Sequence, residues 1–267
     1  MNEQRFPGGI EWTRLPRPDG TFTKGYTWNP ISGCLHGCTW TMPDGSEARC
    51  YAENVAEHGV AKSAYPQGFA VHAFHPERLP EPLRVRRPAG IFLDSMSDLG
   101  GRWLPDAEVQ QVLAVCREAS WHTFFLLTKN APRLPRFLIP PNVWVGASSP
   151  PDGMWGRALS RTQQERMLHK IMQTLATIPV SVRWVSFEPL SWDCAAIVAQ
   201  YPGVLQWAVI GAASDGVKHY PPAPATLERL LVVLDGQGVP VFYKSNLRSL
   251  SMAAAAWRAH FPGRSTL

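Results

Sequence analysis

Seven short apolar runs, separated by helical or loop segments, constrain the fold of this chain more than any other feature. Each run ends in small or polar residues, and together they cover residues 26–29, 90–94, 123–128, 143–146, 182–186, 205–210 and 240–244. Residues 106–120 have apolar side chains at helical spacing, and residues 161–177 and 226–236 are predicted as two further helices. Continuous apolar strands that alternate with helices are typical of a parallel sheet covered by helices.

The pattern therefore predicts an α/β fold with about six to seven parallel strands. The chain has 267 residues, close to the roughly 250 that are typical of a single α/β barrel. We expect one domain over residues 1–267, with an N-terminal segment at residues 1–25 and an inserted loop at residues 39–49. An open or partial barrel fits the strand count, and a doubly wound open sheet is the alternative.

Composition narrows the class of protein. Hydrophobic residues make up 45% and charged residues 18%, which indicates a folded chain with a sizeable core. The sequence shows neither a signal peptide nor an apolar run long enough to cross a membrane, so we expect a cytoplasmic protein without a membrane partner. The net charge of +5 suits an anionic partner such as nucleic acid or a phosphorylated substrate.

Six of the predicted strands end in hydroxyl-bearing or charged residues. These ends are residues 94–98, 128–130, 146–149, 186–189, 211–215 and 244–246. Because the carboxyl ends of parallel strands meet at one edge of the sheet, we expect these side chains to line one polar pocket. For any single residue, ordinary solvent exposure of a strand end is the alternative.

Three of the five cysteines lie close together in sequence, just after the first predicted strand. Cys34, Cys38 and Cys50 have the spacing C-x3-C-x11-C, and a Pro-Asp-Gly turn signal at residues 43–45 can fold the long gap back on itself. Cys50 would then return beside Cys38, and three thiolates would converge. Cys116, on the apolar side of a predicted helix, is expected in the core.

Three interpretations of this cysteine group remain open at this stage. The thiols could be unliganded, or they could bind zinc together with His36 or His58. Alternatively, three thiolates can hold a four-iron cluster by three corners and leave one iron open. The position of the loop, at the carboxyl edge of an α/β sheet, favours the iron–sulfur cluster.

Several short motifs then point to a known family. They are residues 26–30 (YTWNP), 33–34 (GC), 50–53 (CYAE), 95–98 (SMSD), 127–129 (LTK), 186–189 (SFEP) and 242–244 (FYK). In this order, over about residues 10–247, they resemble the phage-associated branch of the radical S-adenosylmethionine (radical SAM) superfamily, usually described only as a conserved phage protein.

The resemblance implies a partial (β/α) barrel of the radical SAM type. It also implies a [4Fe-4S] cluster on Cys34, Cys38 and Cys50, with S-adenosylmethionine bound to the open iron. Such an enzyme takes an electron from an external flavodoxin- or ferredoxin-like donor and makes a 5′-deoxyadenosyl radical that abstracts hydrogen from its substrate. If the chain is phage-encoded, the host cytoplasm is its expected location.

The resemblance also implies roles for residues at the strand ends. The candidates for cofactor binding are Ser95, Ser97, Asp98, Lys129, Ser148, Ser186 and Glu188. The candidates for catalysis or substrate binding are Tyr51, Glu53, Ser214, Asp215, Lys244 and Asn246. The basic run Arg84, Arg86 and Arg87 could follow a phosphate backbone, or it could be a solvated loop.

The sequence departs from the superfamily pattern in ways that concern the substrate. The usual cysteine spacing is C-x3-C-x2-C, and Ala212 and Ala213 follow Gly211 where two glycines and a glutamate are common. Ser148-Ser149-Pro150 stands where a carboxylate-bearing segment is common. We expect a modified nucleoside in phage DNA as substrate, with a radical isomerisation in thymidine hypermodification. Radical SAM repair of a nucleic-acid base or RNA modification is one alternative, and a zinc-stabilised nucleic-acid-binding protein without catalysis is another.

Overall fold

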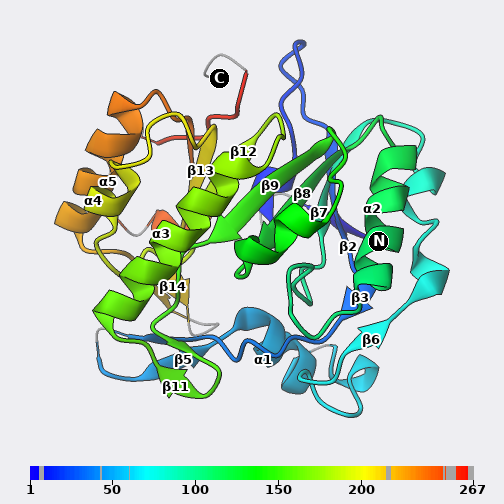
Figure 1. The fold of residues 1–267 in the computed structure, drawn as a ribbon, viewed down its shortest axis with the longest axis horizontal. Coiled ribbons are helices and arrows are strands. Elements are labelled where there is room, and N and C mark those ends of the chain that lie inside the picture. The colour runs from blue at the N-terminus through cyan, green and yellow to red at the C-terminus, as the bar shows by residue number, and fades with distance from the viewer. Residues whose placement is uncertain are drawn as a thin grey trace.

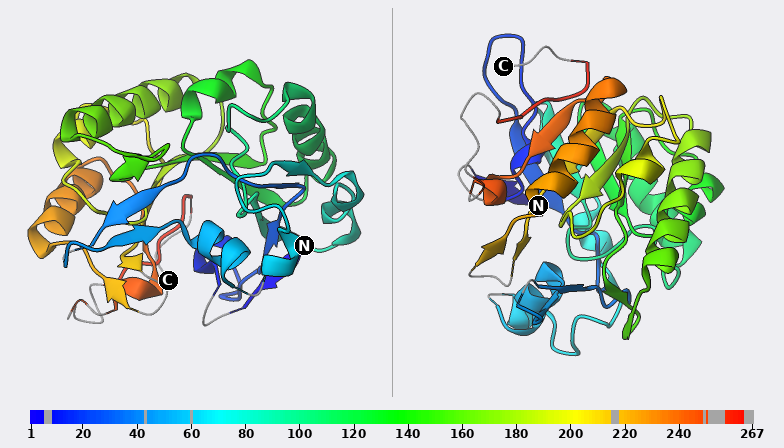
Figure 2. Two further views of the ribbon diagram at one scale, coloured as in Figure 1. Left: turned by 90° about the horizontal axis from the view of Figure 1, so that it is seen from below. Right: turned by 90° about the vertical axis from the view of Figure 1, so that its left-hand side faces the viewer.

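The centre of the molecule is a curled eight-stranded sheet that forms a half-barrel (Figures 1 and 2). The structure is a computed structural model that describes residues 1–5, 9–42, 44–59, 61–214, 218–248, 250 and 257–263. Within these residues, seven strands of the sheet are parallel: β2 (Lys24–Trp28), β7 (Ala89–Leu93), β8 (Thr123–Thr128), β9 (Val143–Ser148), β12 (Arg183–Phe187), β13 (Trp207–Ile210) and β16 (Val241–Tyr243). Strand β1 (Asn2–Gln4) extends the sheet antiparallel to β2.

The parallel strands lie in the same order in the sheet as in the chain. Because crossovers between parallel strands are right-handed, an unbroken order places all of them on the same side of the sheet. The expectation of a partial barrel is therefore confirmed, and the doubly wound alternative, whose strand order reverses, is wrong.

Helices cover the convex side of the half-barrel (Figure 2). The described helices on this side are α2 (Asp106–Glu118), α3 (Arg161–Thr177), α4 (Ala195–Val198) and α5 (Pro224–Gly236). The three predicted helices are confirmed with ends that differ by at most two residues. Ser160 begins α3 with a capping box, in which its side chain and that of Gln163 each bind the other residue's backbone N–H.

Both faces of the sheet are buried, although successive side chains point to opposite faces. On β12, Val185 and Phe187 belong to the large core beneath the helices, whereas Trp184 belongs to a second core on the concave face. Trp12, from a short 3₁₀ helix at Glu11–Thr13, packs into this second core. Two buried faces explain why the strands are apolar throughout rather than alternating.

Concave-face side chains change from large to small or charged along each strand. On β9 the sequence of concave positions is Trp144, Gly146, Ser148; on β12 it is Trp184, Ser186, followed by Glu188 beyond the strand. On β8, Phe125 and Leu127 precede Lys129. The amino-terminal half of the concave face is thus an aromatic layer, and the polar side chains lie above it at the carboxyl ends of the strands, which we call the carboxyl rim.

Smaller sheets lie at the carboxyl rim, at the bottom of Figure 1. Strands β4 (Thr39–Thr41) and β5 (Glu47–Arg49) form a hairpin, and β10 (Gly153–Met154) joins it to β11 (Arg157–Ala158) in a four-stranded sheet. Helix α1 (Tyr51–Glu57) follows the hairpin; neither it nor the hairpin's pairing with β10 was predicted. Two short pairs complete the rim: β3 (Ile31–Ser32) with β6 (Ala73–Phe74), and β14 (Ala213–Ser214) with β15 (His219–Tyr220). Among the described residues, each helix is too short or too polar to span a membrane.

Trp12 offers a test of the aromatic layer. Its ring makes edge-to-face contacts with Phe92, Phe125 and Trp184 at centroid distances of 4.9, 5.3 and 5.2 Å. We expect Trp12→Ala to destabilise the protein by about 3–5 kcal/mol, because it leaves a large cavity under the sheet. Urea unfolding followed by fluorescence measures the effect, and Leu138→Ala, at a side chain that is 80% exposed, is the control that should change stability by less than about 0.5 kcal/mol. An equal effect of both variants would contradict the packing described here.

Candidate functional site

The three clustered cysteines lie on the loop of residues 33–50, which we call the cysteine loop, at the carboxyl rim. The β4–β5 hairpin brings its two ends together, since the Cys50 N–H donates to the Cys38 carbonyl at 3.0 Å. Cys34 and Cys50 pack against the same small apolar cluster, formed by Ala52, Ala56 and Phe69. The fold-back that the turn signal predicted is therefore present, and eleven intervening residues do not separate Cys50 from Cys38.

Burial shapes the chemistry of these thiols. It raises the pKa of Cys34 well above its usual range, and the neighbouring Asp98, Cys38 and Cys50 raise it further. Burial likewise raises the pKa of Cys38 to about 12, although the Lys129 ammonium group opposes the shift. Buried thiols such as Cys34 and Cys38 ionise when a cation compensates for burial, and a bound metal is such a cation.

The thiols fit an iron–sulfur cluster in number and chemistry. Cysteine thiolates are the ligands of such clusters, and three of them leave one corner open. Among the residues that the structure describes, no three His, Cys, Asp or Glu side chains are already gathered as metal ligands. Binding therefore requires the three thiols to turn toward a common centre.

A buried pair of side chains anchors the cysteine loop to the sheet. His36, between Cys34 and Cys38, lies with Nε2 at 2.7 Å from the Asp98 carboxylate, and both residues are at most 5% exposed. Asp98 also accepts from the backbone N–H groups of Gly100 and Lys129, each at 2.8 Å. The carboxylate oxygens of Asp98, a predicted cofactor-binding residue, thus accept hydrogen bonds from within the protein. The hydrogen bond between Asp98 and His36 also occupies the Nε2 atom of His36.

The other predicted residues after β7 also bind the cysteine loop or its surroundings. Ser97 donates to the Gly33 carbonyl at 2.8 Å, and the Gly33 N–H donates to the Met96 carbonyl at 3.0 Å. The Tyr51 hydroxyl donates to the Ser95 carbonyl at 2.9 Å. Residues 95–98 therefore join the cysteine loop to the second parallel strand.

Lys129 follows β8 and lies beside the cysteines. Its ammonium group is 5.9 Å from the centre of the Trp40 ring, on the hairpin strand that begins just after Cys38. Burial lowers the pKa of Lys129, but the three thiols and Asp98 outweigh burial and raise it overall. Lys129 therefore places a positive charge next to the cysteine loop.

The opposite side of the half-barrel presents an ion pair. The Lys244 ammonium lies 2.8 Å from Glu188 Oε2, while Glu188 Oε1 is buried and has no hydrogen-bond partner in the described structure. Burial lowers the pKa of Lys244, and Glu188 more than compensates, so the lysine stays charged. Asn246 binds both the N–H and the carbonyl of Ala212 at 3.0 Å, which holds the end of β13 in place.

The remaining predicted residues fall into three groups. Ser148 and Ser186 are buried at concave positions of β9 and β12. Glu53 lies on α1 and pairs with Arg49 at 3.3 Å, whereas Ser214 lies in the β14–β15 pair. Asp215 lies outside the described residues.

Two residues that help to hold the site together were not predicted from the sequence. Asn29 directly follows β2, and its side-chain oxygen accepts from the Ser95 hydroxyl and the Met96 N–H, each at 3.1 Å. Its place at a strand end was a signal that could have identified it. Glu11 accepts from the Ser245 N–H at 2.9 Å across 234 positions of sequence, and no local pattern indicates such a contact.

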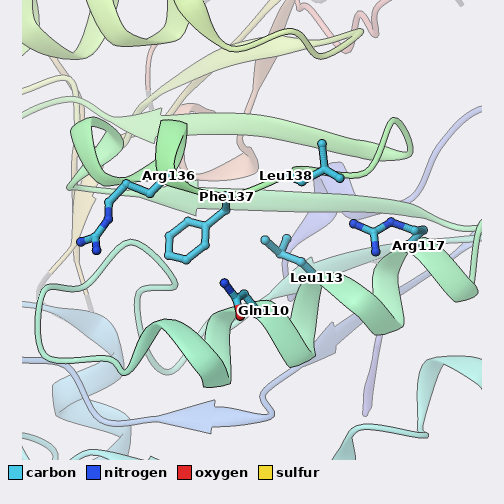
Figure 3. A pocket seen from close by; sticks show the side chains of 6 residues that line it. All are labelled: Gln110, Leu113, Arg117, Arg136, Phe137 and Leu138. Atoms are coloured by element: carbon cyan, nitrogen blue, oxygen red, sulfur yellow. The ribbon is translucent and has the colours of Figure 1, made fainter.

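Two other surface features lie away from the carboxyl rim. Arg84, Arg86 and Arg87 are exposed but precede β7, so they lie at the amino-terminal end of the strands, opposite the cysteine loop. Figure 3 shows a pocket of about 220 Å³ on the outer layer, between α2 and the segment after β8. Its lining contains no predicted site residue; it consists of Gln110, Leu113, Arg117, Arg136, Phe137 and Leu138.

Comparisons with known proteins concern the fold first and the family second. The half-barrel is similar to that of spore photoproduct lyase, solved in complex with dinucleoside spore photoproduct. The TM-score is 0.50 at 7% sequence identity, over 85% of this chain and 77% of the lyase, and a likeness at this identity concerns the fold. The chain belongs to the family described as "Protein of unknown function (DUF5131)", which matches residues 9–259. None of the curated proteins matches the sequence.

Asp98 provides a test of the anchoring network. We expect Asp98→Asn to lower the free energy of unfolding at pH 7 by about 1–3 kcal/mol, because a buried charged hydrogen-bond acceptor is lost. Asp193→Asn is the control, because Asp193 forms an exposed ion pair with Arg229 that contributes at most about 1 kcal/mol. Urea denaturation of the three proteins measures both effects, and similar losses in the two variants would contradict the proposed anchor.

The pKa of Asp98 predicts how the stability of the protein depends on pH. Burial raises the pKa of Asp98, but hydrogen bonds from His36, Thr128 and the Lys129 N–H outweigh it, so the folded-state pKa lies below 3.8. The stability from this carboxylate is therefore complete above pH 3.8 and is lost as the pH falls through the folded-state value. The difference between the wild type and Asp98→Asn should shrink as the pH falls below 3.8 through the folded-state pKa of Asp98. A difference that does not shrink in this acid range would exclude this assignment.

Proposed function

We propose that this protein is a radical SAM enzyme that binds a [4Fe-4S] cluster through Cys34, Cys38 and Cys50. The single observation that supports this best is the Cys50–Cys38 backbone hydrogen bond, which closes the cysteine loop at the carboxyl rim of the half-barrel. The motif resemblance described above and the fold shared with spore photoproduct lyase support it further. When bound, the cluster and S-adenosylmethionine would supply a carbon radical that abstracts hydrogen from the substrate.

The described residues suggest how the chain would serve this chemistry. Lys129 places a positive charge beside three thiolates and any anionic group that binds with them. Glu188 Oε1 is a buried acceptor without a partner, so it suits a hydroxyl or ammonium group of a ligand, and Lys244 fixes its orientation. The aromatic layer closes the amino-terminal half of the concave face and keeps water out from that side.

We propose a nucleoside or nucleic acid as the substrate, with phage DNA and a radical isomerisation in thymidine hypermodification as the specific case. The net charge of +5 supports an anionic substrate. The departures from the superfamily pattern at Ser148, Ser149, Ala212 and Ala213 lie on the rim, where a substrate would meet the site. The proposal includes action in the cytoplasm, that of the host if the chain is phage-encoded, and an external one-electron donor.

Repair of a damaged base is the second candidate function. It is favoured by the ligand in the spore photoproduct lyase structure, which is a dinucleoside photoproduct. The two candidates differ in the product, since repair restores a normal base and hypermodification elaborates one. Mass spectrometry of nucleosides from damaged and undamaged DNA after incubation with the enzyme distinguishes them.

Cysteine substitutions test the cluster. We expect anaerobic reconstitution to give a brown protein with about four irons per chain. Cys50→Ala should abolish iron uptake, whereas the matched control Cys116→Ala, in the core beneath the helices, should retain it. Reduced wild-type protein should convert S-adenosylmethionine to 5′-deoxyadenosine, and Cys50→Ala should not. Stoichiometric zinc without iron uptake would instead support the zinc-stabilised binding protein.

Substitution of Glu188 tests whether this side of the half-barrel binds a ligand. We expect Glu188→Gln to weaken S-adenosylmethionine or nucleoside binding about tenfold, because a charged acceptor in a buried site is replaced by a neutral amide. The matched control is Glu228→Gln, on the exposed side of α5, which should bind normally. Equilibrium dialysis measures both, and unchanged binding by Glu188→Gln would remove this residue from the site.

A further inference from the structure

Three exposed apolar side chains belong to residues on the cysteine loop or in backbone contact with it. Leu35, Val71 and Trp155 are 44%, 42% and 47% exposed. Leu35 lies within the loop, and the backbone of Val71 contacts Gly33, where an added Cβ would be 2.1 Å from the Val71 carbonyl oxygen. The Trp155 N–H donates to the His36 carbonyl at 2.7 Å. These three residues, tied to residues 33–36, form what we call the outer patch.

Trp155 occupies a backbone conformation that bulky residues avoid. Strands β10 and β11 are joined by the two residues Trp155 and Gly156, whose φ angles are 56° and 70°. Positive φ at both positions is typical of a type I′ turn, which favours Asn-Gly. A tryptophan there costs conformational energy, although its ring contacts the His36 ring at a centroid distance of 6.3 Å. Backbone strain at an exposed aromatic residue points to a functional reason for its presence.

Positive charge borders the outer patch. Arg157 lies over the Trp155 ring at 5.9 Å. Its side chain is exposed, and within the described part of the chain it has no carboxylate at ion-pair distance. An apolar centre with an arginine at its edge is the composition of a protein-binding surface, and here it suits an acidic partner.

We propose that the outer patch is the docking surface for a small acidic protein that delivers single electrons to the cysteine loop. This inference rests on the proposed function, which requires an electron from outside. The donor is oxidised by one electron, and the sulfonium carbon–sulfur bond of S-adenosylmethionine takes up that electron and breaks into a thioether and a carbon radical. Leu35 lies between Cys34 and Cys38, and Val71 and Trp155 contact residues 33–36, so a donor docked on these residues is close in the chain to the cysteines.

A nucleic acid is the competing occupant, because tryptophan and arginine also bind single strands. Leu35 and Val71 argue against it, since aliphatic side chains neither stack on bases as aromatic rings do nor bind phosphate. They are, however, ordinary members of protein interfaces. The outer patch therefore favours a protein partner.

The substitution Trp155→Asn tests docking of the donor without disturbing the fold. Asparagine suits the type I′ turn, so the variant should be at least as stable as the wild type. With reconstituted enzyme and reduced flavodoxin as the acidic donor, we expect cluster reduction at limiting donor to slow at least about tenfold. Reduction by dithionite, a small reductant that needs no docking surface, should be unchanged. Loss of visible absorbance in a stopped-flow instrument measures both rates.

Matched controls lie at the other end of the molecule. Trp121 is 40% exposed and precedes β8 at the amino-terminal end of the strands, so Trp121→Asn should leave both rates unchanged. Arg157→Glu should slow reduction by flavodoxin about fivefold at low salt and less at high salt, because its charge is solvent-exposed. Arg117→Glu, in the pocket of Figure 3, should have no such effect.

The outcomes distinguish this inference from the proposed function. If no cluster forms in the wild type, the proposed function fails and this inference fails with it. If the cluster forms and dithionite reduces it, but Trp155→Asn accepts electrons from flavodoxin at the wild-type rate, only the docking surface is wrong. Weakened binding of an oligonucleotide by Trp155→Asn, with unchanged reduction by flavodoxin, would assign the outer patch to nucleic acid instead.

Discussion

The unbroken order of the seven parallel strands is the constraint on which the rest of the described structure depends. Right-handed crossovers in that order leave all connecting helices on one side, so the opposite face of the sheet stays free and becomes concave. All parallel strands then end at the same rim. The cysteine loop and the residues that hold it, such as Asn29 and Asp98, follow the first two strands at this rim. Their proximity is a consequence of strand order.

The concave face combines two requirements in one surface. Near the amino-terminal ends of the strands it must be filled, and large rings such as Trp184 and Trp207 occupy it. These rings need space, and Gly146 provides it: an added Cβ there would lie 2.3 Å from the Trp184 ring. Nearer the rim the side chains are small or charged, which leaves acceptors such as Glu188 Oε1 without a partner inside the protein. A dry aromatic layer beneath a polar rim is a suitable setting for reactive chemistry, because it excludes water from one side.

The long gap between Cys38 and Cys50 changes little in the position of the two residues. A hairpin returns the chain to its starting point whatever its length, and here β10 pairs with its first strand and fixes its direction. The gap adds Trp40 near Lys129, and its first residue, Thr39, pairs with Gly153 of β10, two residues before Trp155. Residues 39–49 thus add contacts around the cysteines while the hairpin keeps Cys38 and Cys50 adjacent.

Local patterns in the sequence determined the strands, the three long helices, the fold class and the return of Cys50 to Cys38. Each depends on periodicity or on a turn signal within a few residues, and such signals do not require knowledge of the rest of the chain. Only the tertiary structure decided that Asp98 binds His36 rather than facing a ligand, and that Glu11 reaches Ser245. These contacts join segments far apart in sequence, and their geometry depends on how the loops pack after the sheet has curled. A strand end can be predicted from sequence, but the partner that its side chain meets depends on the neighbouring strands.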